Sequence, residues 1–393
     1  MSIPCRSVFA QLRNLIPQGV FDRLVHEHKH EARSKGFPSR HQFLAMLFMQ
    51  LGQAHSLREI ELGLGSNLGP LEQLGLTAAP ARSTLAYANE HRSWKLYEAL
   101  FHEVLATAQK IAQQGQSHGL RFKQKLFSID ATVIDLCAAI FDWAKFRQTK
   151  GAVKLHLTLD HQGCLPCYAV ITEGRRHEAT VARTLEFPCG AMVTMDRGYV
   201  DYALFGRWID QGIDFVTREK KNALWDFVEE RPVPENRNIR RDTLIRLSSD
   251  KAQKDCPHTL RRVVVWLEDK QQELVLVTNN LKLGATTIAA IYKARWKIEL
   301  FFKSLKQNFH VKTFVGTSAN ALKTQLWIAL IAMLLVQIVR MQAVIRWSIS
   351  NLVAFLRLHL MTRVDLWVLV NDPIPAPKPP RADQTPLLAL EYG

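Results

Sequence analysis

The hydrophobic period of the chain changes near residue 121, and this change restricts the possible folds more than any other feature. Residues 1–120 place apolar side chains at helical spacing, and a capping box of Ser56 and Glu59 opens one of the predicted helices. Beyond residue 121 the spacing becomes strand-like, and the predicted order up to residue 218 is β-β-β-α-β-α-β. The pattern predicts an all-helical N-terminal domain followed by an α/β domain with one mixed central sheet flanked by helices.

A second β-rich stretch interrupts the α/β domain at residues 219–280. It begins with a polar, proline-containing segment and continues with the strand-like runs "TLIRLSSD", "LRRVVVWLED" and "QELVLVTNN". We predict a β-rich insertion here, after which the α/β domain resumes over residues 281–372. Within that part, helices are predicted over residues 291–309, 319–342 and 349–360. The proline-rich tail, residues 373–393, is predicted to be extended.

The chain is strongly basic, with 51 Lys and Arg against 36 Asp and Glu, which gives a net charge of +15. Such a charge suits a polyanionic partner, either a nucleic acid or an anionic membrane surface. No basic amphipathic helix supports the membrane alternative. The apolar run at residues 326–336 is shorter than the roughly 20 residues that cross a bilayer, so we expect a buried core helix.

The cysteines give little indication of a metal site or a disulfide framework. There are 6 of them at irregular spacing, which favours a reducing, cytoplasmic setting. Cys164 and Cys167 form a lone CxxC motif, which we interpret as part of a hairpin turn. The first residues lack the apolar core and cleavage site of a signal peptide.

Three acids stand where elements of the predicted fold would present them. Asp130 ends the predicted strand "LFSID", Asp196 ends the predicted strand "MVTMD", and Glu299 lies on the predicted helix 291–309. A single Asp after a strand is usually a turn residue or a helix cap. Together, however, three carboxylates from separate elements suit a pair of Mg²⁺ ions that catalyse displacement at a phosphodiester.

The helix that carries Glu299 has an unusual polar face. Tyr292, Arg295, Glu299 and Lys306 fall within roughly a 60° arc, opposite a continuous apolar stripe. An ordinary amphipathic helix with a Glu299–Lys303 pair would explain part of this pattern. This pair does not account for the aromatic ring of Tyr292 and the guanidinium of Arg295 on the same line.

The spacing Tyr292-x₂-Arg295-x₃-Glu299-x₆-Lys306 resembles the signature of the IS4 family of bacterial DDE transposases. The loop "DRGY" at residues 196–199 and the stretch "IDATVID" around Asp130 resemble the other two catalytic motifs of that family. The helical head, including "GFPSRHQFLAMLFMQLG" and "SLREIELGL", is similar to the N-terminal domain of one branch. The resemblance covers roughly residues 5–360 and implies an RNase H-like catalytic domain.

The resemblance also implies roles for individual residues. Asp130, Asp196 and Glu299 would form the catalytic triad and bind two Mg²⁺ ions, for which Mn²⁺ would substitute. The DNA contacts would come from Tyr292, Arg295, Trp296, Lys306 and Arg197. Some relatives form a DNA hairpin with the help of a second Trp, but Leu274 stands at the corresponding position here, so the hairpin step stays open. Ala131, where Ser or Gly is common, is a minor departure.

The implied function is that of a DNA transposase. Residues 1–120 would bind the terminal inverted repeats of an insertion element, and the catalytic domain would cleave at its ends. The free 3′-hydroxyl groups would then be joined to target DNA. Synapsis of two ends implies a homodimer, and the resemblance places the protein in the bacterial cytoplasm, at the nucleoid. The alternative is a catalytically inactive or domesticated relative that only binds DNA.

Overall fold

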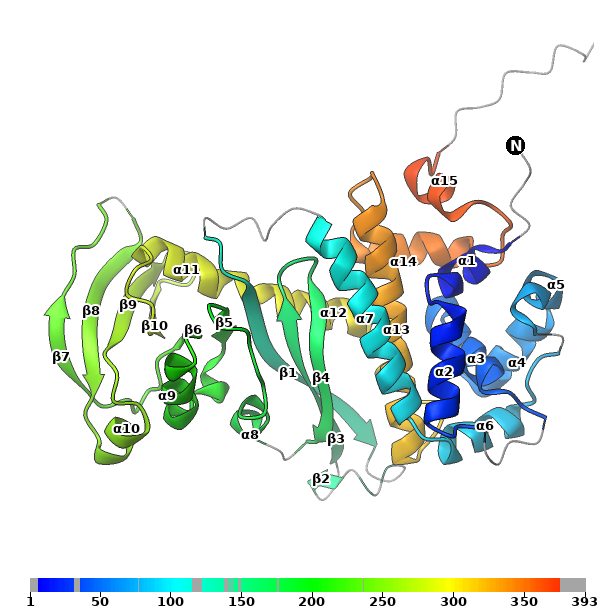
Figure 1. Ribbon diagram of the computed structural model, residues 1–393, viewed down its shortest axis with the longest axis horizontal. Coiled ribbons are helices and arrows are strands. Elements are labelled where there is room, and N and C mark those ends of the chain that lie inside the picture. Colours follow the sequence, from blue (N-terminus) through cyan, green and yellow to red (C-terminus); the bar gives the residue numbers. More distant parts are fainter. Residues whose placement is uncertain are drawn as a thin grey trace, which may run out of the picture.

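The computed structural model describes residues 6–374, apart from residues 32–35, 77, 115–121, 138–140, 142, 144, 148–149, 175–176 and 236. The molecule is elongated, with a long sheet towards one end and a bundle of helices towards the other (Figure 1). Most of the predicted C-terminal tail, from residue 375 onwards, lies outside the described residues.

The first part of the sheet has the mixed pairing expected of an RNase H-like domain. Its strands lie in the spatial order β4-β3-β1-β5-β6. β1 is antiparallel to β3 and parallel to β5, and β5 is parallel to β6. This mixed sheet flanked by helices confirms the predicted fold class. The strands are β1 (Leu126–Cys137), β2 (Lys145–Arg147), β3 (Lys150–Asp160), β4 (Leu165–Glu173), β5 (Met192–Met195) and β6 (Asp214–Arg218).

The strands of the β-rich stretch continue the same sheet. β10 pairs with β6, and the order then runs β10-β9-β8-β7 to a total of 10 strands. The three apolar runs noted in the sequence correspond to β8, β9 and β10. β7 lies in the segment that looked merely polar, and it is exposed along most of its length because it forms the edge of the sheet. The strands are β7 (Trp225–Glu230), β8 (Ile239–Leu247), β9 (Leu260–Leu267) and β10 (Gln272–Thr278).

Helices cover the two faces of the sheet next to β5. On one face, Val193 and Met195 pack against α9 in a cluster that contains Trp208. On the other face, Met192 packs against α11 in a cluster that contains Ile291. Successive side chains of β5 point to opposite faces of the sheet, so this strand packs against a helix on each face. These helices are α8 (Glu178–Ala182), α9 (Tyr202–Asp210), α10 (Asp250–Asp255) and α11 (Ala285–Ala294), with the 3₁₀ turn η3 (Arg197–Tyr199) before α9.

The N-terminal helices and the C-terminal helices share one hydrophobic core. The capping box is present: the Glu59 amide donates to Ser56 Oγ over 3.2 Å, and Ser56 Oγ donates to Glu59 Oε1 over 3.0 Å. The helices before the sheet are α1 (Val8–Asn14), α2 (Gln18–Glu27), α3 (Ser39–Gly52), α4 (Leu57–Gly65), α5 (Leu68–Leu71), η1 (Glu72–Leu74), α6 (Arg82–His91) and α7 (Lys95–Gln114). Those after it are α12 (Trp296–Asn308), α13 (Ala319–Gln342), α14 (Ile349–Leu358) and α15 (Leu366–Asn371).

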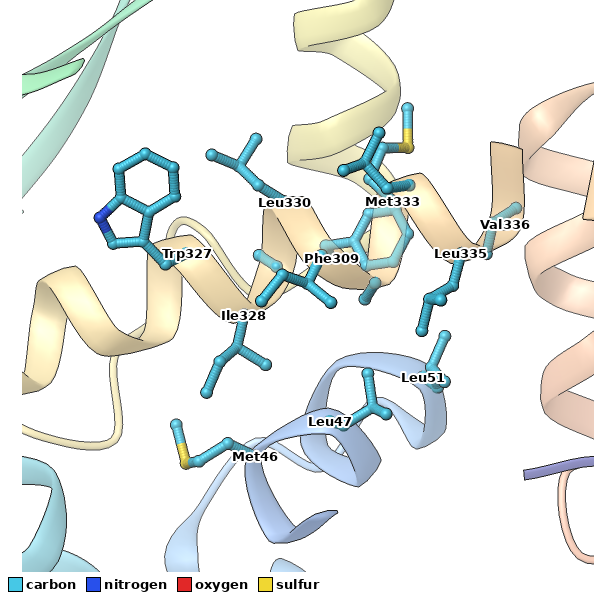
Figure 2. Close-up of a cluster of buried hydrophobic side chains, with 14 of the residues drawn as sticks. Met46, Leu47, Leu51, Phe309, Trp327, Ile328, Leu330, Met333, Leu335 and Val336 are labelled. Carbon is cyan, nitrogen blue, oxygen red and sulfur yellow. The ribbon is translucent and has the colours of Figure 1, made fainter. Parts of the chain in front are cut away.

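Helix α13 is the centre of this core. It packs against α3, α6, α7 and α14, and Figure 2 shows Met46, Leu47 and Leu51 of α3 facing its apolar side chains. In the described part of the chain, α13 is the one helix long and apolar enough to cross a membrane. Its most apolar 18-residue window is 94% buried inside the protein, as expected of a core helix.

The predicted single helix over residues 291–309 is wrong in one respect. The structure contains two helices, α11 and α12, which meet at Arg295. There the Arg295 amide donates to the Tyr292 carbonyl, and the Ile298 amide donates to the Arg295 carbonyl, over 3.1 and 3.0 Å. Both bonds span three residues and not four, so the turn at Arg295 is tightened and the regular α-helical ladder is interrupted.

Candidate active site

The three predicted acids lie on neighbouring elements. Asp196 directly follows β5, and Glu299 is in the first turn of α12. The parallel register pairs Ile129 with Met195, so the next residues, Asp130 and Asp196, lie side by side on one face of the sheet. The prediction that Asp130 ends its strand is wrong, because β1 continues to Cys137 and remains paired with β3 along that length.

Arg295 joins two of the acids from the junction of α11 and α12. Its Nη1 lies 3.3 Å from Asp130 Oδ2, and its Nη2 lies 2.5 Å from Glu299 Oε1. The arginine side chain is 12% exposed, whereas those of Asp130 and Glu299 are 21% and 32% exposed. The tightened turn at Arg295 therefore places one guanidinium between carboxylates that are separated by 169 positions in the sequence.

Tyr292 connects the same helix pair to the third acid. Its hydroxyl donates to Asp196 Oδ1 over 3.5 Å, at the limit of a hydrogen bond. The Arg295 guanidinium lies 5.6 Å from the centre of the Tyr292 ring, which is within the range of a cation–π contact. The five residues Asp130, Asp196, Tyr292, Arg295 and Glu299 are thus brought together, as their sequence motifs suggested.

The surroundings of Asp130 favour its protonated form. Burial is the main cause that raises the pKa of Asp130 to about 6; the Ala131 amide and Arg295 oppose this shift, and the negative charges of Glu299 and Asp196 contribute to it. Burial also raises the pKa of the Tyr292 hydroxyl to about 12. Asp196 and Glu299 are near enough to Asp130 to raise its pKa, and Arg295 supplies positive charge that partly compensates them.

The chemistry of these donors fits a divalent cation, although a closed metal site is not formed. In the described residues, no three His, Cys, Asp or Glu side chains gather closely enough to hold one metal ion. The guanidinium of Arg295 lies between Asp130 and Glu299, and its Nε is buried without a hydrogen-bond partner among the described residues. Carboxylate oxygens are the ligands that Mg²⁺ prefers, so Asp130, Asp196 and Glu299 are suitable metal ligands.

The other predicted DNA-contact residues surround this centre. Trp296 is 56% exposed on α12, directly after Arg295. Lys306 donates from Nζ to the Val133 carbonyl of β1 over 2.8 Å, and burial lowers the pKa of its ammonium group. Arg197 follows Asp196, and its Nε is buried without a partner in the described part of the chain. Leu274, by contrast, is partly buried against the apolar side of α11, away from solvent.

Sequence reasoning missed the residues that support the turn after Asp196. Glu178 of α8 lies against Gly198, and Lys154 of β3 holds Glu178 at 3.2 Å. Tyr199 is 1% exposed, and its hydroxyl has no hydrogen-bond partner among the described residues. One signal was available: a glycine directly after Asp196 and Arg197 indicates that another group approaches the backbone closely.

Comparisons with known proteins agree with this geometry. A family model described as "Transposase DDE domain" matches residues 121–335, and a "Domain of unknown function (DUF4372)" matches residues 4–77. The chain belongs to the DDE transposase family. This transposase is 30% identical over 292 residues to a putative transposase of Sinorhizobium fredii, covering 70% of this chain and 80% of the relative.

Two further relatives are transposases of named insertion sequences. A probable transposase for the element IS5377 of Geobacillus stearothermophilus is 31% identical over 221 residues, which cover 56% of this chain and 57% of the relative. A putative transposase for the element IS4SA of Synechocystis is 25% identical over 224 residues, covering 54% and 60%. These matches agree with the IS4 family that the motifs indicated. A solved synaptic complex of piggyBac transposase with hairpin DNA aligns with a TM-score of 0.46 at 10% identity, over 91% of this chain and 80% of that chain.

Proposed function

We propose that this transposase binds the terminal inverted repeats of its insertion element, cleaves the DNA at both ends and joins the 3′-hydroxyl groups to target DNA. The observation that carries the proposal is the convergence of Asp130, Asp196 and Glu299 around Arg295 and Tyr292. The acids come from a strand, a strand end and a helix, and Arg295 and Tyr292 together contact all three, which supports the proposal.

Asp130, Asp196 and Glu299 would hold two Mg²⁺ ions, and Mn²⁺ would substitute. When bound, the ions activate the attacking oxygen and stabilise the leaving oxygen of the phosphodiester. Asp130 must be ionised to serve as a ligand, and its burial opposes this by raising its pKa. The positive charge of a bound cation would favour the ionised form of Asp130.

The basic side chains of the site would position the DNA. Arg295 presents a planar fork that matches two phosphate oxygens, and Lys306 acts as a point charge about two turns beyond Glu299 on the same face of α12. Trp296 offers an exposed ring on which a base can stack. Arg197, which adjoins Asp196, adds a further donor. Together with the net charge of +15, these groups favour binding to the DNA backbone, and we expect the affinity to fall steeply with salt.

The remaining parts of the proposal concern assembly. Residues 1–120, which include the DUF4372 match, would recognise the inverted repeats, and two copies would pair two ends in a homodimer. The protein would act in the bacterial cytoplasm, at the nucleoid. A catalytically inactive relative that only binds DNA would not need three acids, and all three are present and gathered here.

The variant Glu299→Gln tests the proposal. We expect it to abolish Mg²⁺-dependent nicking of a plasmid that carries this reading frame with its flanking DNA, because the neutral amide is a poor ligand for a hard cation. Binding of the same DNA should persist, measured by a gel-shift assay. Glu230→Gln is a matched control, since Glu230 is half exposed and pairs with Arg241 at 3.3 Å in the β-rich part. If Glu299→Gln reduced binding and nicking equally, Glu299 would have a structural role and the proposal would fail.

A further inference from the structure

The carboxylate of Glu178 lies very close to Gly198, in the turn after Asp196, so there is no room for a Cβ at this position while Glu178 stays in place. A methyl group on Gly198 would overlap Glu178 Oε2, and it would also lie 3.5 Å from Glu178 Cδ. The φ angle of Gly198 is outside the left-handed region, so the backbone conformation itself does not demand glycine. A Cβ at Gly198 would require the end of the Glu178 side chain to move, and the ion pair of Glu178 with Lys154 opposes that movement.

The carboxylate is anchored to the sheet on its other side. Lys154 Nζ of β3 lies 3.2 Å from Glu178 Oε1, and the two side chains are 16% and 33% exposed. Partial burial makes this pair stronger than an ion pair in open solvent. Lys154 is fixed in register between Val133 of β1 and Thr172 of β4. One oxygen of Glu178 is therefore held by the sheet, while the other covers the turn.

The same short helix holds the far end of the turn. Arg183, the C-cap of α8, donates from Nε to Asp201 Oδ2 over 2.8 Å, and Asp201 accepts from the Leu204 amide as the N-cap of α9. Arg207 of α9 donates back to the Arg183 carbonyl over 2.8 Å. Helix α8 therefore contacts the segment 196–201 twice: Glu178, its first residue, contacts Gly198, and Arg183, its C-cap, contacts Asp201.

The position of Glu178 relative to the acids excludes a direct role as their partner. Asp130 pairs with Leu157 across β1 and β3, whereas Lys154 pairs with Val133. Because 130 and 133 differ by an odd number, Lys154 lies on the face of the sheet opposite to Asp130. The negative charges of Asp130, Glu178 and Asp196 nevertheless all reach the Tyr199 hydroxyl, whose pKa burial raises first and these charges raise further. Glu178 thus contacts the turn from the face of the sheet opposite to Asp130.

We propose that Glu178, anchored by Lys154, is a positioning residue that fixes the turn at Gly198 and thereby sets where Asp196 presents its carboxylate beside Asp130. The proposal uses the nicking reaction of the preceding section for one of its two measurements. The other measurement, binding of Mn²⁺ to the full-length protein without DNA, is independent of that reaction.

A double-mutant cycle of Glu178→Ala and Gly198→Ala tests this contact. Gly198→Ala alone is expected to slow nicking of the plasmid at least tenfold and to weaken Mn²⁺ binding about tenfold, followed by the electron paramagnetic resonance of free Mn²⁺. Glu178→Ala alone should have a smaller effect, about threefold to tenfold, because the turn loses its support without being displaced. The double variant should be no worse than Glu178→Ala, since the overlap with Gly198 has been removed.

The conservative variant separates positioning from folding. Glu178→Gln keeps the shape over Gly198 and an oxygen for Lys154, so it should remain within about threefold of the wild type in both measurements. Glu230→Gln is the matched control at an exposed ion pair, and its rate and Mn²⁺ affinity should not change. All variants should retain the thermal unfolding midpoint of the wild type within a few degrees.

The outcomes distinguish this inference from the proposed function. Losses that multiply in the double variant, or a midpoint that falls in parallel with activity, would overturn the positioning role. If the wild type failed to nick the plasmid while Mn²⁺ binding still followed the predicted cycle, the positioning role would stand and the proposed reaction would fail.

Discussion

Arg261 and Arg295, two of the arginines of this transposase that hold carboxylates, do so in different ways. Arg261 of β9 is 2% exposed and donates from Nε and Nη2 to the two oxygens of Asp242 on β8, over 2.8 and 2.6 Å. Its remaining nitrogen donates to the carbonyls of Asn280 and Leu283. Arg295 is divided between two acids from different elements, and its Nε has no partner among the described residues.

This difference indicates what each arginine and its carboxylate partners do in the protein. Every guanidinium nitrogen of Arg261 has a partner, either Asp242 or a backbone carbonyl, and both side chains are 2% exposed, so the pair is closed to other ligands. Arg295 and its acids remain partly exposed and incompletely satisfied, which leaves donors for a phosphate and acceptors for a cation. The first pair fixes the β-rich part of the sheet, whereas the second is available for chemistry.

The largest effect on stability is expected from breaking the buried pair of Arg261 and Asp242. Arg261→Met should lower the free energy of unfolding by about 3–5 kcal/mol, because Asp242 would be left buried without its partner. Urea unfolding followed by tryptophan fluorescence measures this change. Arg241→Met is the matched control: its pair with Glu230 is half exposed and should contribute less than about 1 kcal/mol. Equal effects of the two variants would contradict the comparison.

The second prediction concerns Arg295. Arg295→Gln should reduce the rate of nicking by about 10²–10³, the usual effect of removing a donor that stabilises charge in a transition state. The free energy of unfolding should fall by only about 1–2 kcal/mol, because water reaches the acids that lose their partner. Rates and urea unfolding are measured on the same preparation. A loss of stability as large as that of Arg261→Met would mean that Arg295 is a structural residue.

The smallest expected effect is on the dependence of stability on pH. The pKa of Asp130 is raised from 3.8 to about 6 by burial, so the native state binds this proton more tightly than the unfolded state. Stability from this group is fully present below about pH 4 and is lost as the pH rises through 6. Asp130→Asn should therefore raise the free energy of unfolding at pH 8 by about 1–2 kcal/mol in the presence of EDTA, and leave it unchanged at pH 4. A destabilising effect at pH 8 would show that the ion pair with Arg295 outweighs burial.

Much of the fold could be predicted because it follows from local patterns. The apolar run and its flanking residues defined helix α13 at Ala319–Gln342, and the capping residues Ser56 and Glu59 defined the start of α4. The fixed spacing of Tyr292, Arg295 and Glu299 predicted that these side chains share one face, although they lie on two helices, α11 and α12, that meet at Arg295.

Other features could not be predicted because they depend on contacts across the fold. β7 is exposed along most of its length because it is an edge strand, and its mixture of apolar and acidic residues follows no sustained alternation. The interruption of the helix at Arg295 arises where this side chain reaches Asp130 on β1, which no local pattern records. The contact of Glu178 with Gly198 joins two elements through space, and only the glycine gave any indication of it.

Anomalous diffraction from crystals soaked in MnCl₂ tests the grouping of the three acids most directly. We expect two Mn²⁺ peaks about 4 Å apart, coordinated by oxygens of Asp130, Asp196 and Glu299, with the guanidinium of Arg295 moved out from between the carboxylates. Peaks elsewhere on the protein and none between these three side chains would contradict the site, and with it the proposed reaction.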